Sequence, residues 1–307
     1  MKNFNDKVAV ITGAASGIGK EIAESCAQKG MKIILADVEK TALDKVESQL
    51  RSKGAEVVSI QTDVSKANEV EKLAKKTLDI FNGVHLLVNN AGVVAGTSSW
   101  ESSLNDWEWV MNVNLMGIVH GLHYFVPIML EQDTEAHIVN NASATGLVSY
   151  NLSAPYQVAK HGVVSLSEHL HYSLQQRNAK IGVSVLCTAW VKTRILNSRR
   201  NRPGELKDSS RKTQSGRKHA APYVKKIRQA IKTGMPPKEV AYHVFDAIQN
   251  EDFYIITHPS ETIPLVQHRM EGILNQKSPS ELDIDELLFL DSQHKPAAGP
   301  PEEQQNN

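Results

Sequence analysis

Three side chains in the middle of the chain, Ser143, Tyr156 and Lys160, have types and spacing suited to moving a proton. Tyr156 and Lys160 are four residues apart in a segment expected to be helical, so they lie on one helix face. A free phenol has a pKa of about 10, and an adjacent ammonium lowers that pKa by stabilising the phenolate. Ser143 precedes Tyr156 at the end of an expected strand, where its hydroxyl can hold a carbonyl or alcohol oxygen. The three residues predict a tyrosine general acid/base with a serine that anchors oxygen.

A glycine-rich segment, residues 12–19, follows an apolar run at 7–12 and opens a helical pattern. Its glycines let the backbone turn tightly and approach a pyrophosphate, and the start of the helix offers free N–H groups. The same composition also makes plain turns, but the strand before it and the helix after it favour a dinucleotide site. The residues predicted to contact the dinucleotide are Gly13, Ser16, Gly17, Ile18 and Gly19.

Asp37 ends the next expected strand, eighteen residues after Gly19. A carboxylate at this point accepts hydrogen bonds from the adenosine ribose and repels a 2′-phosphate, which favours NAD over NADP. The alternative is that Asp37 only caps the helix that begins near Lys40. Ser16 is neutral where a phosphate site would benefit from a cation, and only Lys20 favours the phosphorylated cofactor.

Further motifs accompany these residues: Asp63-Val64 after the third expected strand, 89–92 after the fourth, and Asn114 in a long helix. Together they resemble the short-chain dehydrogenase/reductase family over about residues 5–258. The resemblance implies an NAD-dependent oxidoreductase that interconverts a secondary alcohol and its ketone, with hydride transfer by the cofactor. It also implies a homo-oligomer, either a dimer or a tetramer.

The same resemblance assigns roles to single residues. Asp63 would bind the adenine amino group beside Val64, and Asn90 would support the cofactor. Lys160 would bind the nicotinamide ribose, and Asn114 would hold a water that links Lys160 to solvent. Thr193 would meet the carboxamide. The chain has Thr188-Ala189 where the family usually has Pro-Gly, so the loop beside the nicotinamide is expected to follow a different path.

Alternating strands and helices position these residues. Seven short apolar runs are expected to be strands: 7–12, 32–36, 56–60, 85–89, 136–141, 181–187 and 253–257. Helical patterns lie between them at 17–30, 40–53, 66–81, 103–131, 154–177 and 237–250. This order predicts an α/β fold, a doubly wound, seven-stranded parallel sheet of the Rossmann type. We expect one domain at 1–260 and a C-terminal extension at 261–307, acidic after Ser280 and disordered from about 294.

A basic insertion, residues 192–236, interrupts the alternation. Between 192 and 232 fourteen Lys and Arg residues face only two acidic ones. The segment is either a solvated loop or an anion-binding lid, and we expect it to be mobile and to close partly over the nicotinamide. The residues predicted to contact the substrate are Ser143, Leu147, Tyr150 and Trp190, which favour a fairly hydrophobic molecule.

Composition excludes several other classes of protein. Lys plus Arg and Asp plus Glu both number 34, so no net charge attracts nucleic acid. The apolar stretch 111–130 is interrupted by polar residues, which argues against a membrane span. Two cysteines make no disulfide framework and fit a cytoplasmic protein. Histidine pairs two or three residues apart are weak metal ligands, so no metal is expected.

Two alternative functions stay open on the sequence. The first is an NADP-dependent carbonyl reductase, which Asp37 disfavours. The second is a non-catalytic dinucleotide-binding adaptor that uses the basic segment to bind an acidic partner, a membrane surface or nucleic acid. Such a protein has no need of the catalytic residues.

Overall fold

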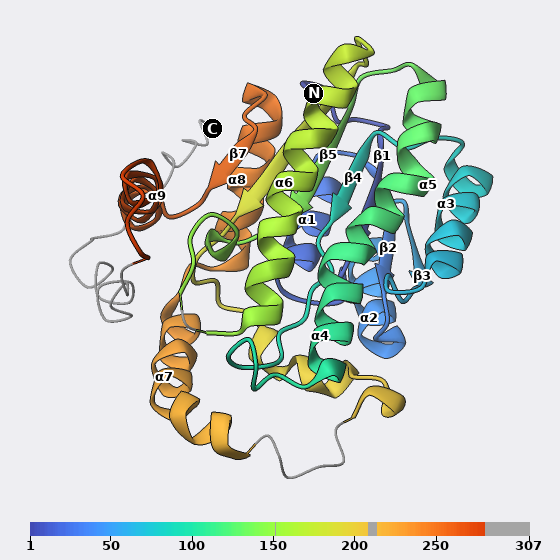
Figure 1. Cartoon of the computed structure of the whole chain (residues 1–307). Helices are drawn as coiled ribbons and strands as arrows, with labels where there is room; N and C mark the ends of the chain where they lie inside the picture. The colour runs from blue at the N-terminus through green and yellow to red at the C-terminus, as the bar shows by residue number, and fades with distance from the viewer. Residues whose placement is uncertain (151, 208–213, 280–307) are drawn as a thin grey trace, which may run out of the picture.

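The computed structural model describes residues 1–150, 152–207 and 214–279. Its centre is a seven-stranded sheet in which every pairing is parallel, in the order β3-β2-β1-β4-β5-β6-β7. The strands are β1 (Val8–Thr12), β2 (Lys32–Asp37), β3 (Val57–Gln61), β4 (Leu86–Asn89), β5 (Ala136–Asn141), β6 (Ile181–Cys187) and β7 (Tyr254–Ile256). All seven predicted strands are present, and the doubly wound parallel sheet is confirmed (Figure 1).

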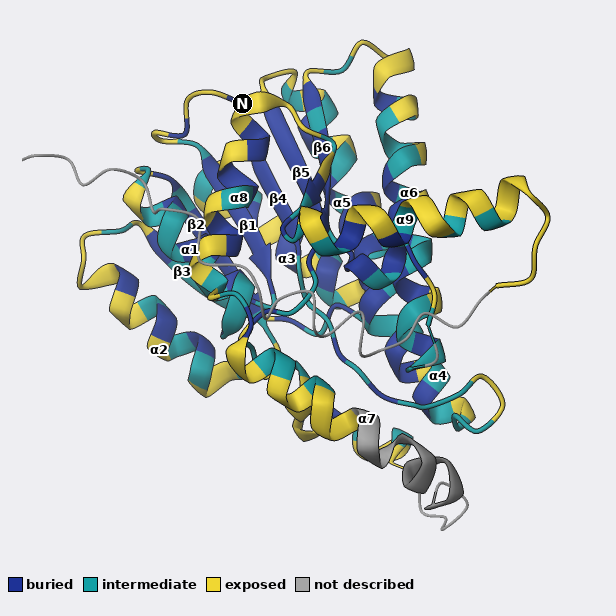
Figure 2. Ribbon diagram, turned by 90° about the vertical axis from the view of Figure 1, so that its left-hand side faces the viewer, coloured by how far each residue is buried: buried dark blue, intermediate teal, exposed yellow. Residues whose placement is uncertain are grey.

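Two apolar layers cover the two faces of the sheet, because side chains alternate along each strand. In β1, Ala9 and Ile11 pack on one side with α1 (Gly17–Gln28), α2 (Lys40–Arg51) and α8 (Pro237–Asn250). Val10 packs on the other side with α3 (Ala67–Phe81), α5 (Gly117–Gln132) and α6 (Ala154–Gln176). Figure 2 shows the strands as buried residues between helices that are exposed on their outer faces. Continuous apolar strands therefore form a core that water does not reach.

The helical stretch expected at 103–131 is three elements. It comprises α4 (Leu104–Met111), the π-helical turn η1 (Asn112–Met116) and α5. By length and composition, helical residues 104–132 could cross a membrane. In this structure 44% of the most apolar window is buried, and α5 packs on α3 and β4. A π turn adds one residue to the backbone ring and often lies at a functional site. No residue type in this stretch signalled it.

Further elements follow β5, β6 and β7: the 3₁₀ turns η2 (Ala144–Gly146), η3 (Ile195–Asn201) and η4 (Gly204–Leu206), and the helices α7 (Gln214–Thr233) and α9 (Pro259–Leu274). The basic insertion thus contains ordered turns and a helix. Its ends meet, since Lys192 N–H donates to the carbonyl of Met235 and Met235 N–H donates to that of Trp190, both at 2.9 Å. The disorder expected from about 294 lies outside the described residues, and the domain boundaries remain predictions.

Candidate active site

The candidate site lies at the carboxyl ends of the strands, where the order reverses between β1 and β4. Open α/β sheets bind their ligands at such a switch point. A cavity of about 1140 Å³ extends there from the glycine-rich loop to the first turn of α9. Its two ends differ in character, because one is built of backbone and carboxylates and the other mainly of apolar side chains.

The glycine-rich loop forms the first end. Gly13 and Gly17 have φ values of +66° and +58°, a backbone region that glycine adopts without strain. Gly13, Ser16, Gly17 and Ile18 line the cavity as predicted. Gly19 does not line it: a Cβ there would lie 2.4 Å from the Gly13 carbonyl oxygen, so Gly19 instead allows α1 to pack against its own loop. The loop fits a pyrophosphate at a helix N-terminus.

Asp37 connects this loop to the end of β2. Its Oδ2 accepts from Ala15 N–H and its Oδ1 from Glu39 N–H, both at 3.0 Å. Burial raises the pKa of Asp37, although the hydrogen bonds from Glu39 and Ala15 act in the opposite direction. The side chain also lines the cavity, so it does more than brace the turn before α2. Its remaining lone pairs suit two ribose hydroxyls.

Asp63, Val64, Asn90 and Thr193 also line the cavity. Asp63 Oδ1 accepts from the backbone and hydroxyl of Ser65 at 3.0 and 2.7 Å, and Asn90 Nδ2 donates to the Thr12 carbonyl at 2.9 Å. Thr193 lies over Gly17, with its methyl 3.3 Å from the position of a Cβ there. The predicted cofactor residues other than Gly19 therefore come together around one space.

Ser143, Tyr156 and Lys160 converge on the middle of the same cavity. Ser143 Oγ donates to the Thr188 carbonyl at 3.3 Å and accepts from Thr145 N–H at 3.2 Å, which fixes the hydroxyl beside Tyr156. Pro155 lies in the first turn of α6, and Ser153 caps that helix. The strand end and the helix start therefore place the three groups together, as their sequence positions predict.

The expected lowering of the Tyr156 pKa is absent in this structure. Burial raises the pKa of Tyr156 to about 12, against the opposite effect of its hydrogen bond with Ser143. Burial also lowers the pKa of Lys160 to about 8. The Lys160 Nζ lies 5.6 Å from the centroid of the tyrosine ring and donates to the Asn141 carbonyl at 2.6 Å. The ammonium is thus held by a backbone oxygen, and desolvation outweighs its effect on the phenol.

Asn114 is fully buried in the π turn and does not line the cavity. Its side chain binds the backbone of Val93 on both sides, accepting from N–H at 2.8 Å and donating to the carbonyl at 2.9 Å. The side chain therefore fixes the loop after β4. The amide retains one lone pair on Oδ1 and one N–H on Nδ2. Its role in holding a water that links Lys160 to solvent stays a prediction.

The second end of the cavity is largely apolar. Tyr150 and Trp190 line it as predicted, whereas Leu147 does not. The η2 turn directs Leu147 to the core on the α5 and α6 side of the sheet, and this prediction is wrong. Residues of α7 and α9 that the sequence analysis missed complete the wall: Val224, Ile227, Ile231, His258, Glu261, Thr262 and Leu265. The spacing of the three α7 residues on one helix face could have indicated them.

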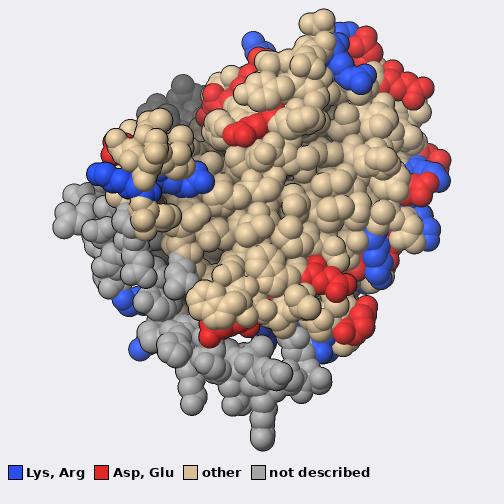
Figure 3. Space-filling view, in the orientation of Figure 1, with Lys and Arg blue, Asp and Glu red and all other residues tan. Residues whose placement is uncertain are grey.

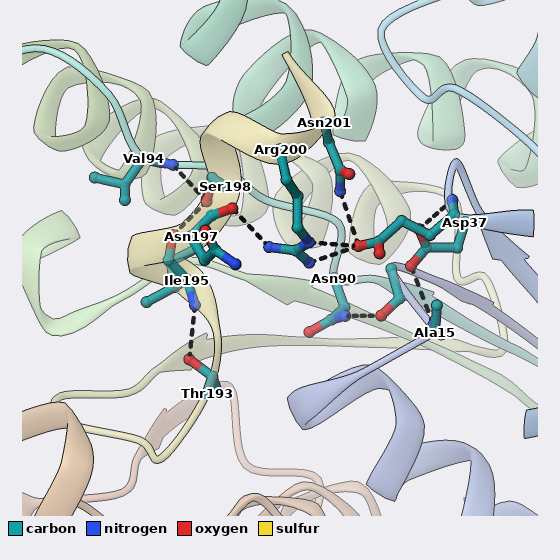
Figure 4. Close-up of polar contacts among 12 residues, drawn as sticks. Ala15, Asp37, Asn90, Val94, Thr193, Ile195, Asn197, Ser198, Arg200 and Asn201 are labelled. Atoms are coloured by element: carbon teal, nitrogen blue, oxygen red, sulfur yellow. Dashed lines mark hydrogen bonds and ion pairs between the residues drawn. The ribbon is translucent and has the colours of Figure 1, made fainter. Parts of the chain in front are cut away.

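Residues 193–202, which we call the strap, cross the cavity (Figure 4). Ser198 Oγ accepts from Val94 N–H at 3.3 Å, and Arg200 binds the carboxylate of Glu39. At the far end Arg202 pairs with Asp106 at 2.5 Å, and both side chains are 4% exposed. Ala189, in place of the family's glycine, does not adopt a positive φ. The backbone that leads into the strap therefore has a conformation that alanine adopts without strain. The strap itself is held by three contacts, to Val94, Glu39 and Asp106.

In the described ranges, no three His, Cys, Asp or Glu side chains are grouped as a metal ion would require. Trp109 is buried under Arg202, at 5.4 Å from its guanidinium carbon to the ring centroid, while Trp100 lies exposed at the rim of the cavity. The tryptophans thus pack or border the site rather than forming a separate aromatic pocket.

Comparison with known proteins agrees with this geometry. Residues 7–204 match the family model of the short chain dehydrogenases. A CLA biosynthesis dehydrogenase/reductase from Lactiplantibacillus plantarum is 35% identical over 94% of this chain and 100% of that protein. A C alpha-dehydrogenase from Sphingobium is 30% identical over 92% and 90%. The crystal structure of a Burkholderia phymatum short chain dehydrogenase/reductase in complex with NAD has 44% identity and a TM-score of 0.88, covering 92% and 99%. The chain therefore belongs to the short-chain dehydrogenase/reductase family of oxidoreductases.

Proposed function

We propose that this protein is an NAD-dependent dehydrogenase or reductase that interconverts a secondary alcohol and its ketone. The observation that carries the proposal is the convergence of Ser143, Tyr156 and Lys160 on a cavity whose other end holds the glycine-rich loop and Asp37. One end can hold a dinucleotide and the other an apolar substrate. The reacting groups lie between them, where hydride transfer would take place.

Each catalytic residue has a defined task in this scheme. Tyr156 takes the hydroxyl proton during oxidation and returns one during reduction, and Ser143 holds the same oxygen by its hydroxyl. Lys160 binds the nicotinamide ribose and passes the proton on toward the turn that contains Asn114. When bound, the nicotinamide supplies or accepts the hydride. The chain's own residues therefore orient the substrate and move its proton.

The preference for NAD rests on Asp37. Its carboxylate faces the cavity at the end of β2, where it would accept from the ribose hydroxyls and repel a 2′-phosphate. The Burkholderia relative was crystallised in complex with NAD, which supports the same choice. Asp63, Val64, Asn90 and Thr193 would complete the cofactor site. An NADP-dependent carbonyl reductase is the alternative that Asp37 argues against.

The substrate is proposed to be a small, hydrophobic alcohol or ketone. Tyr150, Trp190 and Leu265 present aromatic and aliphatic surface to this end of the cavity, together with the apolar face of α7. Two relatives are named as a CLA biosynthesis dehydrogenase/reductase and as a C alpha-dehydrogenase. Both names are consistent with the proposed oxidation of an alcohol or reduction of a ketone. We further propose a cytoplasmic homo-oligomer.

A spectrophotometric assay tests the proposal. The absorbance of reduced nicotinamide is followed with NAD and a panel of secondary alcohols, and with NADH and the corresponding ketones. Turnover with hydrophobic members of the panel is expected. If the protein binds NAD but no member of a broad panel reacts, the non-catalytic adaptor becomes the better account.

A further inference from the structure

Glu39 lies at the adenosine end of the cavity and has no role in the function proposed above. It follows Asp37 by two residues, and its backbone N–H donates to Asp37 Oδ1 at 3.0 Å. Its carboxylate contacts the strap, a segment 161 residues away in the sequence. Glu39 Oε1 accepts from Arg200 Nε at 3.0 Å, from Arg200 Nη2 at 2.5 Å and from Asn201 Nδ2 at 2.9 Å. Figure 4 shows these contacts close to Asp37.

Glu39 carries its negative charge in this arrangement. Burial raises the pKa of Glu39, but the hydrogen bonds from Arg200 and Asn201 together with the charge of Arg200 lower it by more, and the net shift is downward. The side chains of Arg200 and Glu39 are 26% and 23% exposed, so solvent screens the pair only in part. The negative charge of Glu39 therefore balances the positive charge of Arg200 within this ion pair.

All three guanidinium nitrogens of Arg200 make a hydrogen bond. Besides the two nitrogens bound to Glu39, Nη1 donates to the Asn197 carbonyl at 2.8 Å. A planar guanidinium is the protein group best matched to a phosphate, because it can bind two oxygens at once. Arg200 lines the cavity together with Asp37 and Glu39, at the end where a 2′-phosphate of the cofactor would have to fit. A side chain suited to binding a phosphate is therefore present at this end of the cavity, but it is bound to the carboxylate of Glu39.

We propose that Glu39 is a second determinant of cofactor choice, because it holds Arg200 in an ion pair and withholds this guanidinium from a 2′-phosphate. This inference rests on the proposed NAD preference. Asp37 acts on the ribose directly, whereas Glu39 acts through Arg200. Removing Asp37 alone then leaves Arg200 paired with Glu39, and full acceptance of NADP requires that this guanidinium be released as well.

The test measures dissociation constants of NADH and NADPH by nucleotide fluorescence for the wild type and four variants. E39Q and E39A remove the charge, and E39A also removes the acceptor. D44N is the matched control, since it removes the same charge from α2, the helix that Glu39 precedes as N-cap. Asp44 pairs with Lys40 and does not line the cavity. E39Q/R200Q removes both partners. Circular dichroism confirms that each variant is folded.

We expect NADPH to bind about five- to tenfold more tightly to E39A, and less so to E39Q, which corresponds to one partly exposed ion pair made available to the phosphate. NADH affinity should change by less than about twofold on the same scale. D44N should match the wild type, and E39Q/R200Q should lose the gain. The proposal is overturned if E39A binds NADPH no better than D44N, or if the gain survives in E39Q/R200Q.

Failure of the proposed function gives a different result. A wild type that binds NADPH as tightly as NADH contradicts the NAD preference, whereas the comparison of E39A with D44N still reports whether Glu39 masks Arg200. A wild type that binds neither nucleotide contradicts the proposed function as a whole.

Discussion

At the scale of single residues, we expect the buried pair of Tyr156 and Lys160 to determine how turnover responds to pH. Burial raises the pKa of the phenol to about 12 and lowers that of the amine to about 8. The two groups lie close together, so their protons leave in steps that belong to the pair. The first proton is expected to leave near pH 8, because burial lowers the pKa of Lys160 to about 8.

This pair predicts opposite pH profiles for the two directions. Oxidation must deliver a proton to the protein, so kcat/KM for the alcohol should rise as the pH increases through about 8, where Lys160 loses its proton. Reduction consumes a proton and should fall over the same range. The measurement is kcat/KM in both directions between pH 6 and about 10. Profiles that are flat across this range would contradict the role of the pair.

Tyr156→Phe removes the hydroxyl and keeps the ring. We expect turnover to fall by about 10²- to 10⁴-fold, the usual contribution of general acid/base catalysis. The thermal midpoint and the NADH dissociation constant should stay near those of the wild type, because the ring still packs in α6. Steady-state kinetics and calorimetry check this, and near-normal activity would remove Tyr156 from the mechanism.

Asp37→Ala deletes the proposed ribose acceptor and the repulsion of a phosphate. The ratio of kcat/KM with NAD to that with NADP should decrease by about tenfold or more, mainly through weaker use of NAD, because a hydrogen bond to a charged group contributes about 1.5–3 kcal/mol. If the ratio does not move, Asp37 serves only to brace the backbone of Ala15 and Glu39.

The residues that sequence could identify are those whose partners are near in the chain or at strand ends. Tyr156 and Lys160 share a helix face, and Asp37 ends a strand, so spacing was sufficient. Leu147 was misplaced because a 3₁₀ turn, unsignalled in the sequence, redirects its side chain. Glu39 and Arg200 lie 161 residues apart, and no local pattern links them.

At the scale of elements, the strap is held by a buried ion pair at its C-terminal end. Asp106 and Arg202 are both 4% exposed and 2.5 Å apart, and the guanidinium lies over Trp109. Asp106 belongs to α4, so this contact ties the strap to the helix that precedes the π turn. The ion pair therefore connects the strap, through α4, to the π turn whose Asn114 fixes the loop after β4.

Asp106→Asn should loosen the strap. Removing one partner of a buried ion pair costs about 3–5 kcal/mol, because the remaining charge loses its compensation. We expect faster hydrogen exchange at 195–202 and a higher KM for the cofactor. Glu71→Gln is the control, since Glu71 pairs with Lys75 on the exposed face of α3, where such pairs contribute less than about 1 kcal/mol. Equal exchange in the two variants would show that the ion pair does not hold the strap.

The helices and strands, like the residues, could be predicted from the sequence where their signals are local. Every strand could be predicted, and so could α1, α2, α3, α6 and α8, since apolar runs and helical periodicity are local signals. The helix α7, inside the basic insertion, was not predicted. The break of the long helix into α4, η1 and α5 could not be predicted, because a π turn depends on the packing of Asn114 against Val93. The helix α9 follows β7 in a region read as an extension, and Pro259 and Pro264 made a helix there difficult to predict.

At the scale of the whole molecule, α5 and α6 present an uncharged face to solvent. Met116, at the start of α5, is 38% exposed, and on α6 Val158 and Tyr172 are 48% and 63% exposed. Figure 3, seen from the same side as Figure 1, shows few Lys, Arg, Asp or Glu side chains over the middle of this face. An apolar area of this kind is typical of contact between subunits.

We expect a homo-oligomer, either a dimer or a tetramer, in which this face is covered. Light scattering after size exclusion should give a mass of two or four chains at working concentration. Val158→Glu places a charge on the exposed side of α6 and should shift the mass toward smaller species. Lys75→Glu on the exposed side of α3 should leave the mass unchanged. A wild-type monomer would contradict this prediction.

The joined ends of the basic insertion have a consequence for how such a protein can evolve. Trp190 and Lys192 are bound to Met235 through two backbone hydrogen bonds, so the chain leaves the sheet and returns to it at nearly the same point. The entropic cost of closing a loop increases only slowly with its length. Everything between the two ends can therefore lengthen, shorten or be replaced as a cassette while β6 and α8 keep their positions. That cassette contains both the strap beside the proposed nucleotide site and the α7 residues that line the cavity. We therefore expect one exchange to change the choice of nucleotide and the range of substrates together.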